Sequence, residues 1–392
     1  MIHIFHHYDA DGYAAAAVII RQYKGKEEFK TYSCKHGVPM DFSNVNPYCD
    51  RVFIVDYSFT DDRDVNSVIE LAKEFIKSGY ERTMRYVKTV DEEPMSVPYQ
   101  DKVNYLRNYL VWIDHHASSA DIIKNDKTGI LNMLAKDVGL VRPDNVYAGC
   151  MLTWLFFNYD NTYTLRTTED LNAIKYFISN EAPIWVQYVD DYDKWAHKME
   201  HSTAFVTGVT STNGGLWNNF LNPDGSYATY VSKHVDGITK KFIKKGKVID
   251  NFRKDENTRA LKGAGFATVI SAVPDSNGNK KDLTVLAINR SGNSLIFGDY
   301  IKYVDAVVVY SFDGHLWNYS IFSHSSKDFP VNNVATMFKD RYGITGGGHA
   351  HAAGWATEKC IFDDGEDPSI ISEKICFKDW VKRFNDLMPY CD

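Results

Sequence analysis

Short apolar segments alternate with segments of helical periodicity in the first half of the chain. Residues 3–5, 51–55 and 111–113 are mostly apolar, with β-branched and aromatic side chains after His3 and Arg51, and they predict three buried strands. Helices are predicted after the first two strands, at 13–21 from residues of high helix propensity and at 62–77 from apolar residues at helical spacing. Strands that alternate with helices indicate βαβ units, so the sequence predicts an α/β fold with a parallel sheet.

Each of the three predicted strands leads into ionisable side chains. The first is followed by His7, Asp9 and Asp11, the second by Asp56, and the third by Asp114, His115 and His116. The carboxyl ends of parallel strands lie along one edge of a sheet, where such folds bind their ligands. On extended backbone, His7, Asp9 and Asp11 would also project from one face. Carboxylates gathered in this way repel one another unless a cation neutralises them, so the pattern predicts a metal site.

Two simpler interpretations of these residues remain open at the level of sequence. An aspartate before a helix often caps its first turn, which would account for one of Asp9 and Asp11 but not for the pair with a histidine. Residues 114–116 could also be an ordinary strand end with two surface histidines.

A fourth apolar segment, at 184–189, leads into Asp190, Asp191 and Asp193 in the manner of the three strand ends. Taken alone, an aspartate-rich turn is more often a solvated loop. Beside three partial ligand sets, however, a fourth acidic donor is what a site for two metal ions needs.

The second half of the chain has a different pattern. Strand-like segments occur at 267–273, 283–289, 306–312 and 316–322, with a hairpin turn at Asp313-Gly314 between the last two. A helix is predicted at 331–341, and another strand at 352–356. Between these two lie Gly346, Gly347 and Gly348, which are expected to form a loop whose free N–H groups suit an anion.

Residues 240–253 are helical in pattern and rich in lysine. A solvated helix face is the expected role of these lysines, with contact to substrate phosphates as the alternative.

Length and charge bound the organisation of the chain and its partners. With 392 residues the chain is too long for one ordinary core, and two domains are expected: residues 1–200, then a helical linker at 201–260, then residues 261–392. The formal net charge is −7, with 44 basic and 51 acidic residues, which argues against extended binding of long duplex DNA but allows a small anionic ligand held by metal ions.

Cysteine usage and the terminal sequence bear on location. The six cysteines form no Cys-x-x-Cys pair, so neither a zinc knuckle nor a disulfide scaffold is indicated, and a reducing cytoplasm is expected. The first residues lack the pattern of a signal peptide, and no apolar run approaches the length of a membrane span.

Taken in order, these motifs resemble those of the DHH phosphoesterases. The family's first motif matches His7, Asp9, Asp11 and Gly12; its second matches Asp56; its third is Asp114-His115-His116; and its fourth lies within residues 190–195. Residues 346–354, Gly-Gly-Gly-His-Ala-His-Ala-Ala-Gly, resemble the signature of the DHH-associated C-terminal domain. The short first motif and the Tyr-Asp-x-Trp form of the fourth most resemble the oligoribonuclease or nanoRNase branch.

The resemblance implies a fold and a set of metal ligands. The fold would be an N-terminal parallel-sheet domain and a smaller C-terminal α/β domain, with the active site in the cleft between them. Two divalent ions would be bound, with Mn²⁺ expected and Mg²⁺ as the alternative. One ion would take His7, Asp9 and Asp56, and the other Asp11, Asp56, His115 and Asp193, with Asp190 and Asp191 as alternatives to Asp193. Asp114 would orient His115, and His116 would face the scissile phosphate.

The resemblance also implies that the C-terminal domain binds substrate. Gly347, Gly348 and His349 would clamp a phosphate and sugar. Where related domains carry an arginine that meets phosphate, this sequence has Phe322, so His324 is a candidate substitute and Phe322 a candidate for stacking on a base.

The implied activity is metal-dependent hydrolysis of short single-stranded RNA or DNA to mononucleotides. The main alternative is a phosphodiesterase of cyclic dinucleotides or other small nucleotides, and a catalytically inactive nucleotide-binding module is a third interpretation. No membrane partner is expected, and a homodimer is left open.

Overall fold

A computed structural model describes the chain over residues 1–23, 25–36, 38–59, 62–86, 97–144, 146–159, 171–211, 237–275, 278–344, 346–363, 367–370 and 374–387. It divides into two compact units, Met1–Ile249 and Asp250–Asp392. The division falls inside one long helix, α11 (Gly237–Ala264). The boundaries predicted from the sequence, with a linker at 201–260, stay a prediction.

The first unit is built on a five-stranded, fully parallel sheet in the order β2-β1-β3-β4-β5. Its strands are β1 (Ile2–His7), β2 (Phe29–Cys34), β3 (Arg51–Val55), β4 (Leu110–Asp114) and β5 (Leu140–Val141). The three strands predicted in this half of the chain are β1, β3 and β4. All five residues of β4 are buried, as expected for a central strand covered on both faces.

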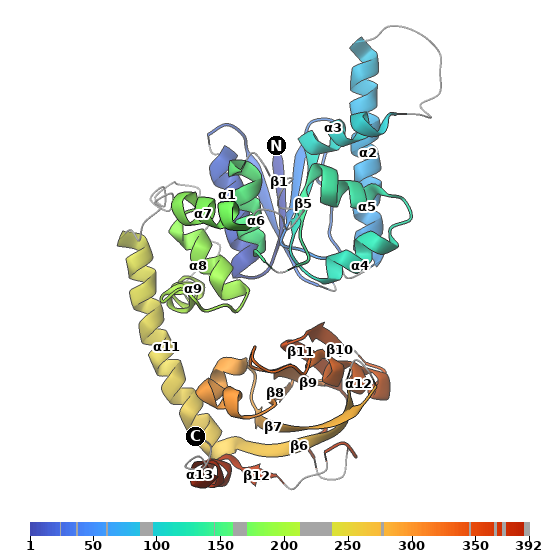
Figure 1. The fold of residues 1–392 in the computed structure, drawn as a ribbon. Helices are drawn as coiled ribbons and strands as arrows, with labels where there is room; N and C mark the ends of the chain where they lie inside the picture. The colour runs from blue at the N-terminus through green and yellow to red at the C-terminus, as the bar shows by residue number, and fades with distance from the viewer. Residues whose placement is uncertain are drawn as a thin grey trace. The chain divides into compact units, whose positions relative to one another are not determined.

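Helices flank this sheet on both sides (Figure 1). On one side lie α1 (Ala10–Tyr23) and α6 (Gly149–Asn158), which pack against each other; on the other lie α2 (Asp62–Tyr86) and α3 (Tyr99–Tyr109). The remaining elements of the unit are α4 (Ser118–Asn125), α5 (Ile130–Met133), the π-helix η1 (Leu134–Val138), α7 (Leu171–Glu181), α8 (Ile184–Asp193) and α9 (Ser202–Thr210).

The fourth apolar segment and the aspartates that follow it form one helix, and not an aspartate-rich turn. Residues 184–193 form α8, which begins after Pro183 and buries Trp185, Val186 and Val189. Proline is well suited to the start of a helix because it has no N–H to leave unpaired. A short apolar run does not by itself distinguish a buried strand from a buried helix face.

The second unit contains a seven-stranded sheet in the order β10-β11-β9-β8-β7-β6-β12. Its strands are β6 (Gly265–Pro274), β7 (Lys280–Asn289), β8 (Ala306–Phe312), β9 (Trp317–Phe322), β10 (Gly346–His349), β11 (Ala352–Thr357) and β12 (Ile375–Cys376). Among the strand pairs that the structure describes in this sheet, β7–β8 is the parallel one, and the connection between these two strands contains the 3₁₀-helix η4 (Ser294–Tyr303). The predicted hairpin at Asp313-Gly314 is confirmed as the antiparallel β8–β9 turn.

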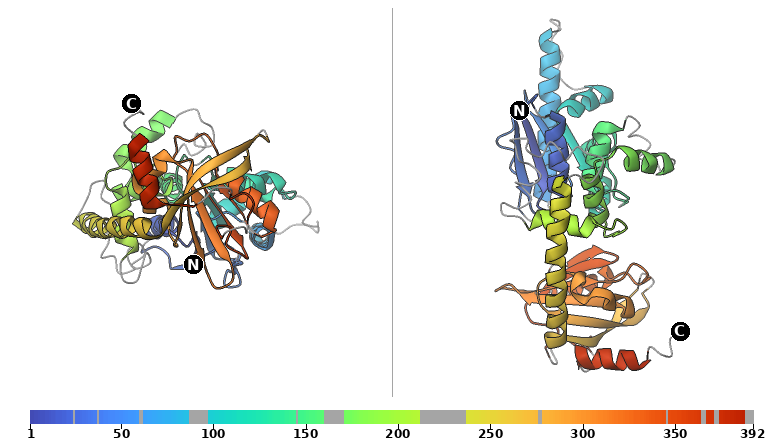
Figure 2. Two further views of the ribbon diagram at one scale, coloured as in Figure 1. Left: turned by 90° about the horizontal axis from the view of Figure 1, so that it is seen from below. Right: turned by 90° about the vertical axis from the view of Figure 1, so that its left-hand side faces the viewer.

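Both faces of the second sheet are covered. Alternate residues of β7 and β8 enter two separate cores: Val285, Ala287 and Val308 face one, while Leu286 and Val307 face the other. Helix α12 (Asn332–Tyr342) packs against β10 and β11, and α13 (Phe377–Leu387) against β6 and β12 (Figures 1 and 2). A parallel-sheet unit followed by a smaller α/β unit is the predicted fold class, which is therefore confirmed; the cleft between the units stays a prediction.

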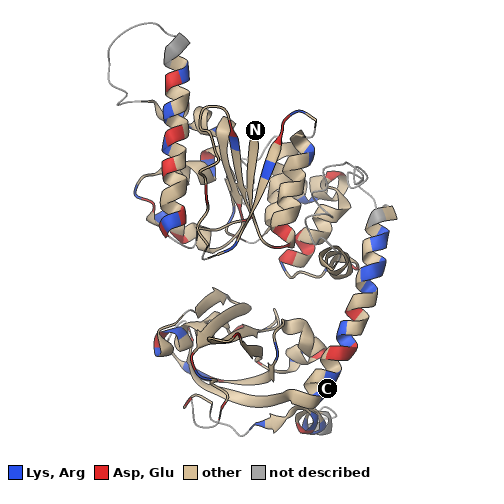
Figure 3. Cartoon of the chain, turned by 180° about the vertical axis from the view of Figure 1, so that it is seen from behind, with Lys and Arg blue, Asp and Glu red and all other residues tan. Residues whose placement is uncertain are grey.

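The lysines of α11 lie mostly on its solvated face, as expected. Lys240, Lys241, Lys244 and Lys247 are exposed, and Lys245 donates a hydrogen bond of 2.9 Å to the carbonyl of Ser211. Figure 3 shows Lys and Arg positions in blue along this helix. Among the described helices, none combines the length and the apolar character needed to cross a membrane.

Candidate metal centre

The predicted ligands leave the first sheet at one edge. Val55 of β3 pairs with His6 of β1 and with Ile113 of β4. The residues that come next in the three strands, His7, Asp56 and Asp114, therefore reach the carboxyl edge of the sheet side by side. The prediction that the acidic strand ends meet along one edge is confirmed.

The first motif turns directly into a helix, so Asp9 and Asp11 do not lie on extended backbone as expected. Helix α1 begins at Ala10, and Asp11 belongs to its first turn. Asp9 Oδ1 accepts a hydrogen bond of 2.9 Å from the Gly12 N–H, which is a helix cap. Its other oxygen, Oδ2, lies 2.7 Å from His7 Nδ1. Asp9 therefore has both predicted roles: it caps the helix and it faces the histidine.

Gly12 permits this sharp turn. A Cβ at this position would lie 2.3 Å from the carbonyl oxygen of His7, closer than any side chain allows. The first turn of α1 therefore packs directly on the end of β1 because the residue is glycine.

Asp56 lies at the middle of the cluster in a strained conformation. Its φ is +53°, in the left-handed region that non-glycine residues seldom occupy, although aspartate does so more readily than most. The side chain is 1% exposed, and neither carboxylate oxygen has a hydrogen-bond partner in the described part of the chain. A buried carboxylate whose two oxygens accept no hydrogen bond needs a compensating charge, and a bound cation supplies one.

The Nε2 atom of His115 faces three carboxylates. It lies 3.2 Å from Asp56 Oδ1, 3.4 Å from Asp193 Oδ2 and 3.6 Å from Asp11 Oδ2. These three aspartates come from the end of β3, the last residue of α8 and the first turn of α1. The fold therefore brings residues far apart in sequence to one imidazole nitrogen.

Three groups of possible metal ligands result, each with ligand atoms within 4.8 Å of one another. They are His7, Asp9 and Asp56; Asp11, His115 and Asp193; and Asp56, His115 and His116. Asp56 and His115 each belong to two of the three groups, and Asp56 Oδ1 lies 3.2 Å from His115 Nε2, so Asp56 borders both of the predicted ligand sets. Carboxylate and imidazole donors together suit Mn²⁺, and carboxylate-rich sites also accept Mg²⁺, so the residues fit the predicted ions.

The electrostatics of the cluster point in the same direction. Burial, followed by the nearby carboxylates of Asp11 and Asp9, raises the pKa of Asp56 well above its ordinary value. The same causes raise the pKa of Asp193. Like charges held this close favour the protonated acid, and a divalent cation would remove that repulsion.

Asp114 orients His116 rather than His115, which corrects the role implied by the family resemblance. Its Oδ1 lies 2.7 Å from His116 Nδ1, and its Oδ2 accepts a hydrogen bond from the Ser119 hydroxyl. The reason is that the His115 ring turns its Nε2 towards the three carboxylates. Burial lowers the pKa of His116, but the charge and hydrogen bond of Asp114 outweigh burial and raise it to about 9. The contact with Asp114 therefore favours the protonated form of the His116 ring.

Of the three candidate aspartates of α8, Asp193 is the one brought to the cluster. Asp190 accepts a hydrogen bond of 2.7 Å from the Ala148 N–H and forms an ion pair with Lys194. Asp191 accepts hydrogen bonds from the N–H groups of Lys198 and Met199. Both of these carboxylates fix backbone next to the site.

The amino end of α6 is a part of the site that the sequence did not reveal. The N–H groups of Gly149 and Cys150 donate hydrogen bonds of 2.6 and 2.9 Å to the two oxygens of Asp11. A Cβ on Gly149 would lie 2.6 Å from Asp56 Cβ and 2.9 Å from Asp11 Oδ2. Helix α6 thus orients Asp11 through its free amides, and only glycine leaves room for the two carboxylates.

The predicted substrate-binding residues Gly347, Gly348 and His349 belong to the second unit. Gly347 and Gly348 belong to strand β10, which corrects the expected loop, and the side chain of His349 lies outside the described part of the structure. Gly348 has φ of +142°, and a Cβ there would lie 2.5 Å from Ala353 Cα, so close strand pairing accounts for this glycine.

Phe322 and His324 also have local partners. Phe322 is partly buried at the end of β9 and packs against one of the two cores of the sheet. His324 Nδ1 lies 2.8 Å from the Ser326 hydroxyl. The proposed contacts of these residues with substrate stay predictions.

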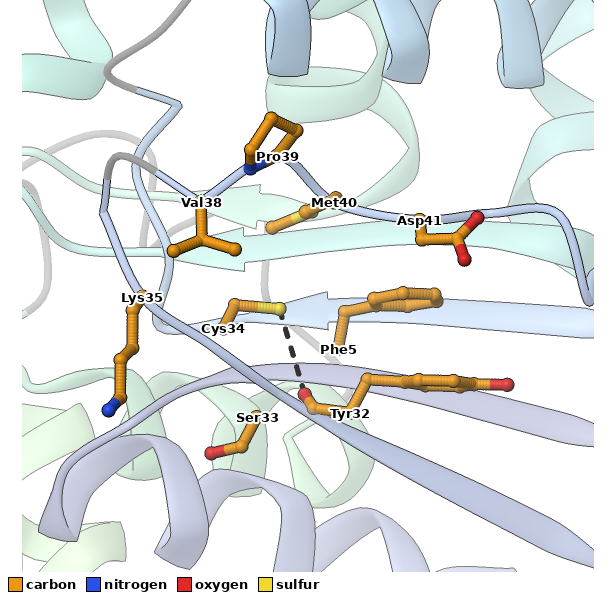
Figure 4. A pocket seen from close by; sticks show the side chains of 9 residues that line it. All are labelled: Phe5, Tyr32, Ser33, Cys34, Lys35, Val38, Pro39, Met40 and Asp41. Carbon is orange, nitrogen blue, oxygen red and sulfur yellow. Dashed lines mark hydrogen bonds between the residues drawn. The ribbon is translucent and has the colours of Figure 1, made fainter.

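A small cavity of about 240 Å³ lies beside the end of β2 (Figure 4). Its lining includes Phe5, Tyr32, Cys34 and Lys35, and none of the predicted metal ligands. Burial raises the pKa of the Cys34 thiol to about 12, so this cysteine is not a nucleophile near neutral pH.

Comparison with known proteins relates the part of the chain that carries the metal cluster to a family. Residues 1–176 match the model of the DHH family, N-terminal domain. The comparison with curated proteins returned no match. The matched residues contain every predicted ligand except Asp193, which lies beyond their end.

Solved structures that the chain is similar to include a pGpG-specific phosphodiesterase, PggH, from Vibrio cholerae, at 10% identity and a TM-score of 0.41, covering 100% of this chain and 98% of that one. Another is RecJ in complex with Mn²⁺ from Thermus thermophilus, at 14% identity and a TM-score of 0.39, covering 98% of this chain and 51% of that one. A third is an uncharacterised protein from Helicobacter pylori, at 11% identity and a TM-score of 0.34, with 98% of each chain covered.

Proposed function

We propose that this chain is a metal-dependent phosphodiesterase that hydrolyses short single-stranded oligonucleotides to mononucleotides. The observation that carries the proposal is the grouping of carboxylates and imidazoles around Asp56, whose two buried oxygens lack hydrogen-bond partners among the described residues. The match of residues 1–176 to the DHH family supports it, because the members that the sequence resembles are phosphoesterases. A reducing cytoplasm is the proposed location.

The residues divide into two ligand sets. His7, Asp9 and Asp56 would hold one divalent ion, and Asp11, Asp56, His115 and Asp193 the other, with Asp56 shared. Ions bound there would supply a Lewis acid and an activated water for in-line attack on a phosphodiester. The amides of Gly149 and Cys150 keep Asp11 aligned, and the helix cap at Gly12 keeps Asp9 aligned.

His116 is the proposed substrate-facing group. Its Nδ1–H donates to Asp114, which leaves Nε2–H as the second donor of the protonated ring. Nε2–H can donate a hydrogen bond to a phosphate oxygen, and it can give its proton to the oxygen that leaves when the ester bond breaks. Asp114 stabilises the charged ring without touching the substrate.

Preference for short oligonucleotides rests on the likeness to the oligoribonuclease or nanoRNase branch. The C-terminal unit would bind the sugar and phosphate through Gly347, Gly348 and His349. The negative net charge of −7 is consistent with a small substrate bound at one site and not with a long duplex. Whether RNA or DNA is preferred is a question for the same assay.

The proposal is tested with purified protein, Mn²⁺ and a panel of substrates. The panel contains linear dinucleotides, oligomers of increasing length and cyclic dinucleotides. We expect turnover of linear dinucleotides with mononucleotide products, dependence on Mn²⁺, and decreasing kcat/KM with length. If linear dinucleotides are not turned over while cyclic dinucleotides are, the alternative of a cyclic-dinucleotide phosphodiesterase replaces this proposal. Binding of nucleotides without any turnover would support an inactive binding module.

A further inference from the structure

Three helices, α1, α6 and α8, pack against one another beside the metal cluster (Figure 1). Two carboxylates of the cluster come from these helices, Asp11 from the first turn of α1 and Asp193 from the last residue of α8. Helix α6 supplies no carboxylate, but the N–H groups of Gly149 and Cys150 at its amino end hold both oxygens of Asp11. The spacing between α6 and α8 therefore affects how Asp11 and Asp193 are placed relative to each other.

The carboxylate of Asp190 joins α8 to the amino end of α6. Its Oδ1 accepts a hydrogen bond of 2.7 Å from the N–H of Ala148, the residue that immediately precedes α6. Its Oδ2 lies 2.7 Å from Lys194 Nζ. Asp190 is 9% exposed and Ala148 is fully buried, so water competes little for these contacts.

Lys194 strengthens the same connection. It directly follows α8, and its Nζ donates a hydrogen bond of 2.8 Å to the carbonyl of Val146, in the segment that leads into α6. The same ammonium lies 5.4 Å from the centroid of the Tyr147 ring. Residues 146–148 are thus attached to α8 by two charged side chains that also pair with each other.

Asp190 and Lys194 adjoin the site through the chain itself. Lys194 directly follows Asp193, and the residue bound by Asp190, Ala148, directly precedes Gly149. A buried ion pair is a weak source of net stability, because removing the charges from water offsets their attraction. Its hydrogen bonds to two backbone groups of another segment, by contrast, fix the distance between the end of α8 and the start of α6.

We propose that Asp190 and Lys194 form a clamp that positions the ligands of one of the two proposed metal ions and not those of the other. The clamped set contains Asp11, which α6 holds, and Asp193, which α8 carries. The other set comes from the ends of β1 and β3 and the cap of α1, and no residue of α6 or α8 belongs to it. This inference rests on the proposed function and deepens it, because it gives the two ions of the same site separate supports.

The test is a titration of the metal-free full chain with Mn²⁺, followed by calorimetry, for Lys194→Met and Lys73→Met. Lys73 is the matched control, because it also pairs with a neighbour on its helix, Glu70, at 2.6 Å, but on the exposed surface of α2. We expect Lys194→Met to weaken one of the two binding events by about 10- to 100-fold, as is typical when the support of a metal ligand is lost, and to leave the other nearly unchanged. Lys73→Met should match the wild type.

Two further variants identify the ion and the interaction. Asp193→Asn removes a proposed ligand, so the binding event that it abolishes is the one that Lys194→Met should weaken. Lys194→Arg keeps the charge and the donors, so it should recover most of the lost affinity. Turnover by Lys194→Met should also recover at high Mn²⁺ concentration, which a generally damaged fold would not allow. Equal weakening of both events in Lys194→Met, or weakening of neither, would overturn the clamp.

Hydrogen exchange of the Gly149 and Cys150 amides in the metal-free protein tests the clamp without metal or substrate. Both amides donate to Asp11, and the clamp holds the segment before them, so they should exchange faster in Lys194→Met than in Lys73→Met. Equal exchange rates would contradict the clamp. If the wild type hydrolyses no dinucleotide, the proposed function fails, whereas the Mn²⁺ titrations and the exchange rates still decide this inference.

Discussion

At the scale of single residues, the site depends on which hydrogen bonds and ion pairs each polar atom already forms with its neighbours. Asp190 and Asp191 resemble Asp193 in type and position, yet their oxygens are occupied by backbone N–H groups and a lysine. Asp193 instead lies 3.4 Å from His115. Likewise, Asp114 bonds His116 and leaves His115 to the carboxylates. Such assignments depend on contacts, and residue types alone do not determine them.

The Asp114–His116 pair gives a prediction about pH. Asp114 raises the pKa of His116 to about 9, so His116 keeps its proton below that pH and loses it above. If the protonated ring serves the reaction, kcat falls as the pH rises through this value. The variant Asp114→Asn removes the negative charge, so the fall should move to lower pH, and kcat near neutral pH should decrease by about 10- to 100-fold.

The measurement is kcat as a function of pH for the wild type and Asp114→Asn at saturating Mn²⁺. Mn²⁺ affinity should be similar in the two proteins, because Asp114 is not a proposed ligand. An alkaline limb at the same pH in both proteins would show that the charge of Asp114 does not control the group that titrates.

At the scale of secondary structure, the site is assembled where helix ends meet strand ends. Helix α1 brings Asp11, helix α8 brings Asp193 at its last turn, and the amino end of α6 supplies two N–H groups to Asp11. The close approach of α6 depends on Gly149, since any Cβ there would contact the carboxylates of Asp11 and Asp56.

Gly149→Ala should therefore damage metal binding more than folding. The added methyl group has to displace Asp56 or Asp11, and we expect Mn²⁺ affinity to fall by at least about 10-fold, a loss typical of disturbed support around metal ligands. Gly263→Ala in α11 is the control, because its Cβ would meet nothing within 4 Å. That variant should bind Mn²⁺ normally and be slightly more stable, since alanine favours helix. Titration calorimetry with Mn²⁺ compares the two, and equal affinities would contradict the role of Gly149.

At this scale, some elements of the site could be predicted from the sequence and others could not. Strands β1, β3 and β4 and their acidic ends were predictable because buried parallel strands are apolar runs and βαβ order places their ends together. Helix α8 was not predicted, because a short, mostly apolar segment fits a strand and a buried helix face equally well. The contacts of Gly149 carry no local signal in the sequence, since they arise from segments that meet only in the folded chain.

At the scale of the whole molecule, the chain consists of two units with separate cores. The candidate metal ligands that the structure groups together lie in the first, Met1–Ile249. The proposed sugar and phosphate contacts at residues 347–349 belong to the second, Asp250–Asp392. The proposed metal binding therefore involves residues of the first unit, and it can be tested without reference to substrate.

The most direct test of the central claim is a Mn²⁺ titration of the metal-free protein, followed by calorimetry, for the wild type, Asp56→Asn and Asp191→Asn. The account predicts two Mn²⁺ ions per wild-type chain, severe loss of binding in Asp56→Asn because both ions share that carboxylate, and nearly unchanged binding in Asp191→Asn, whose carboxylate binds backbone outside the cluster. Binding in Asp56→Asn that equals the wild type, or no binding of Mn²⁺ to the wild type, would contradict it.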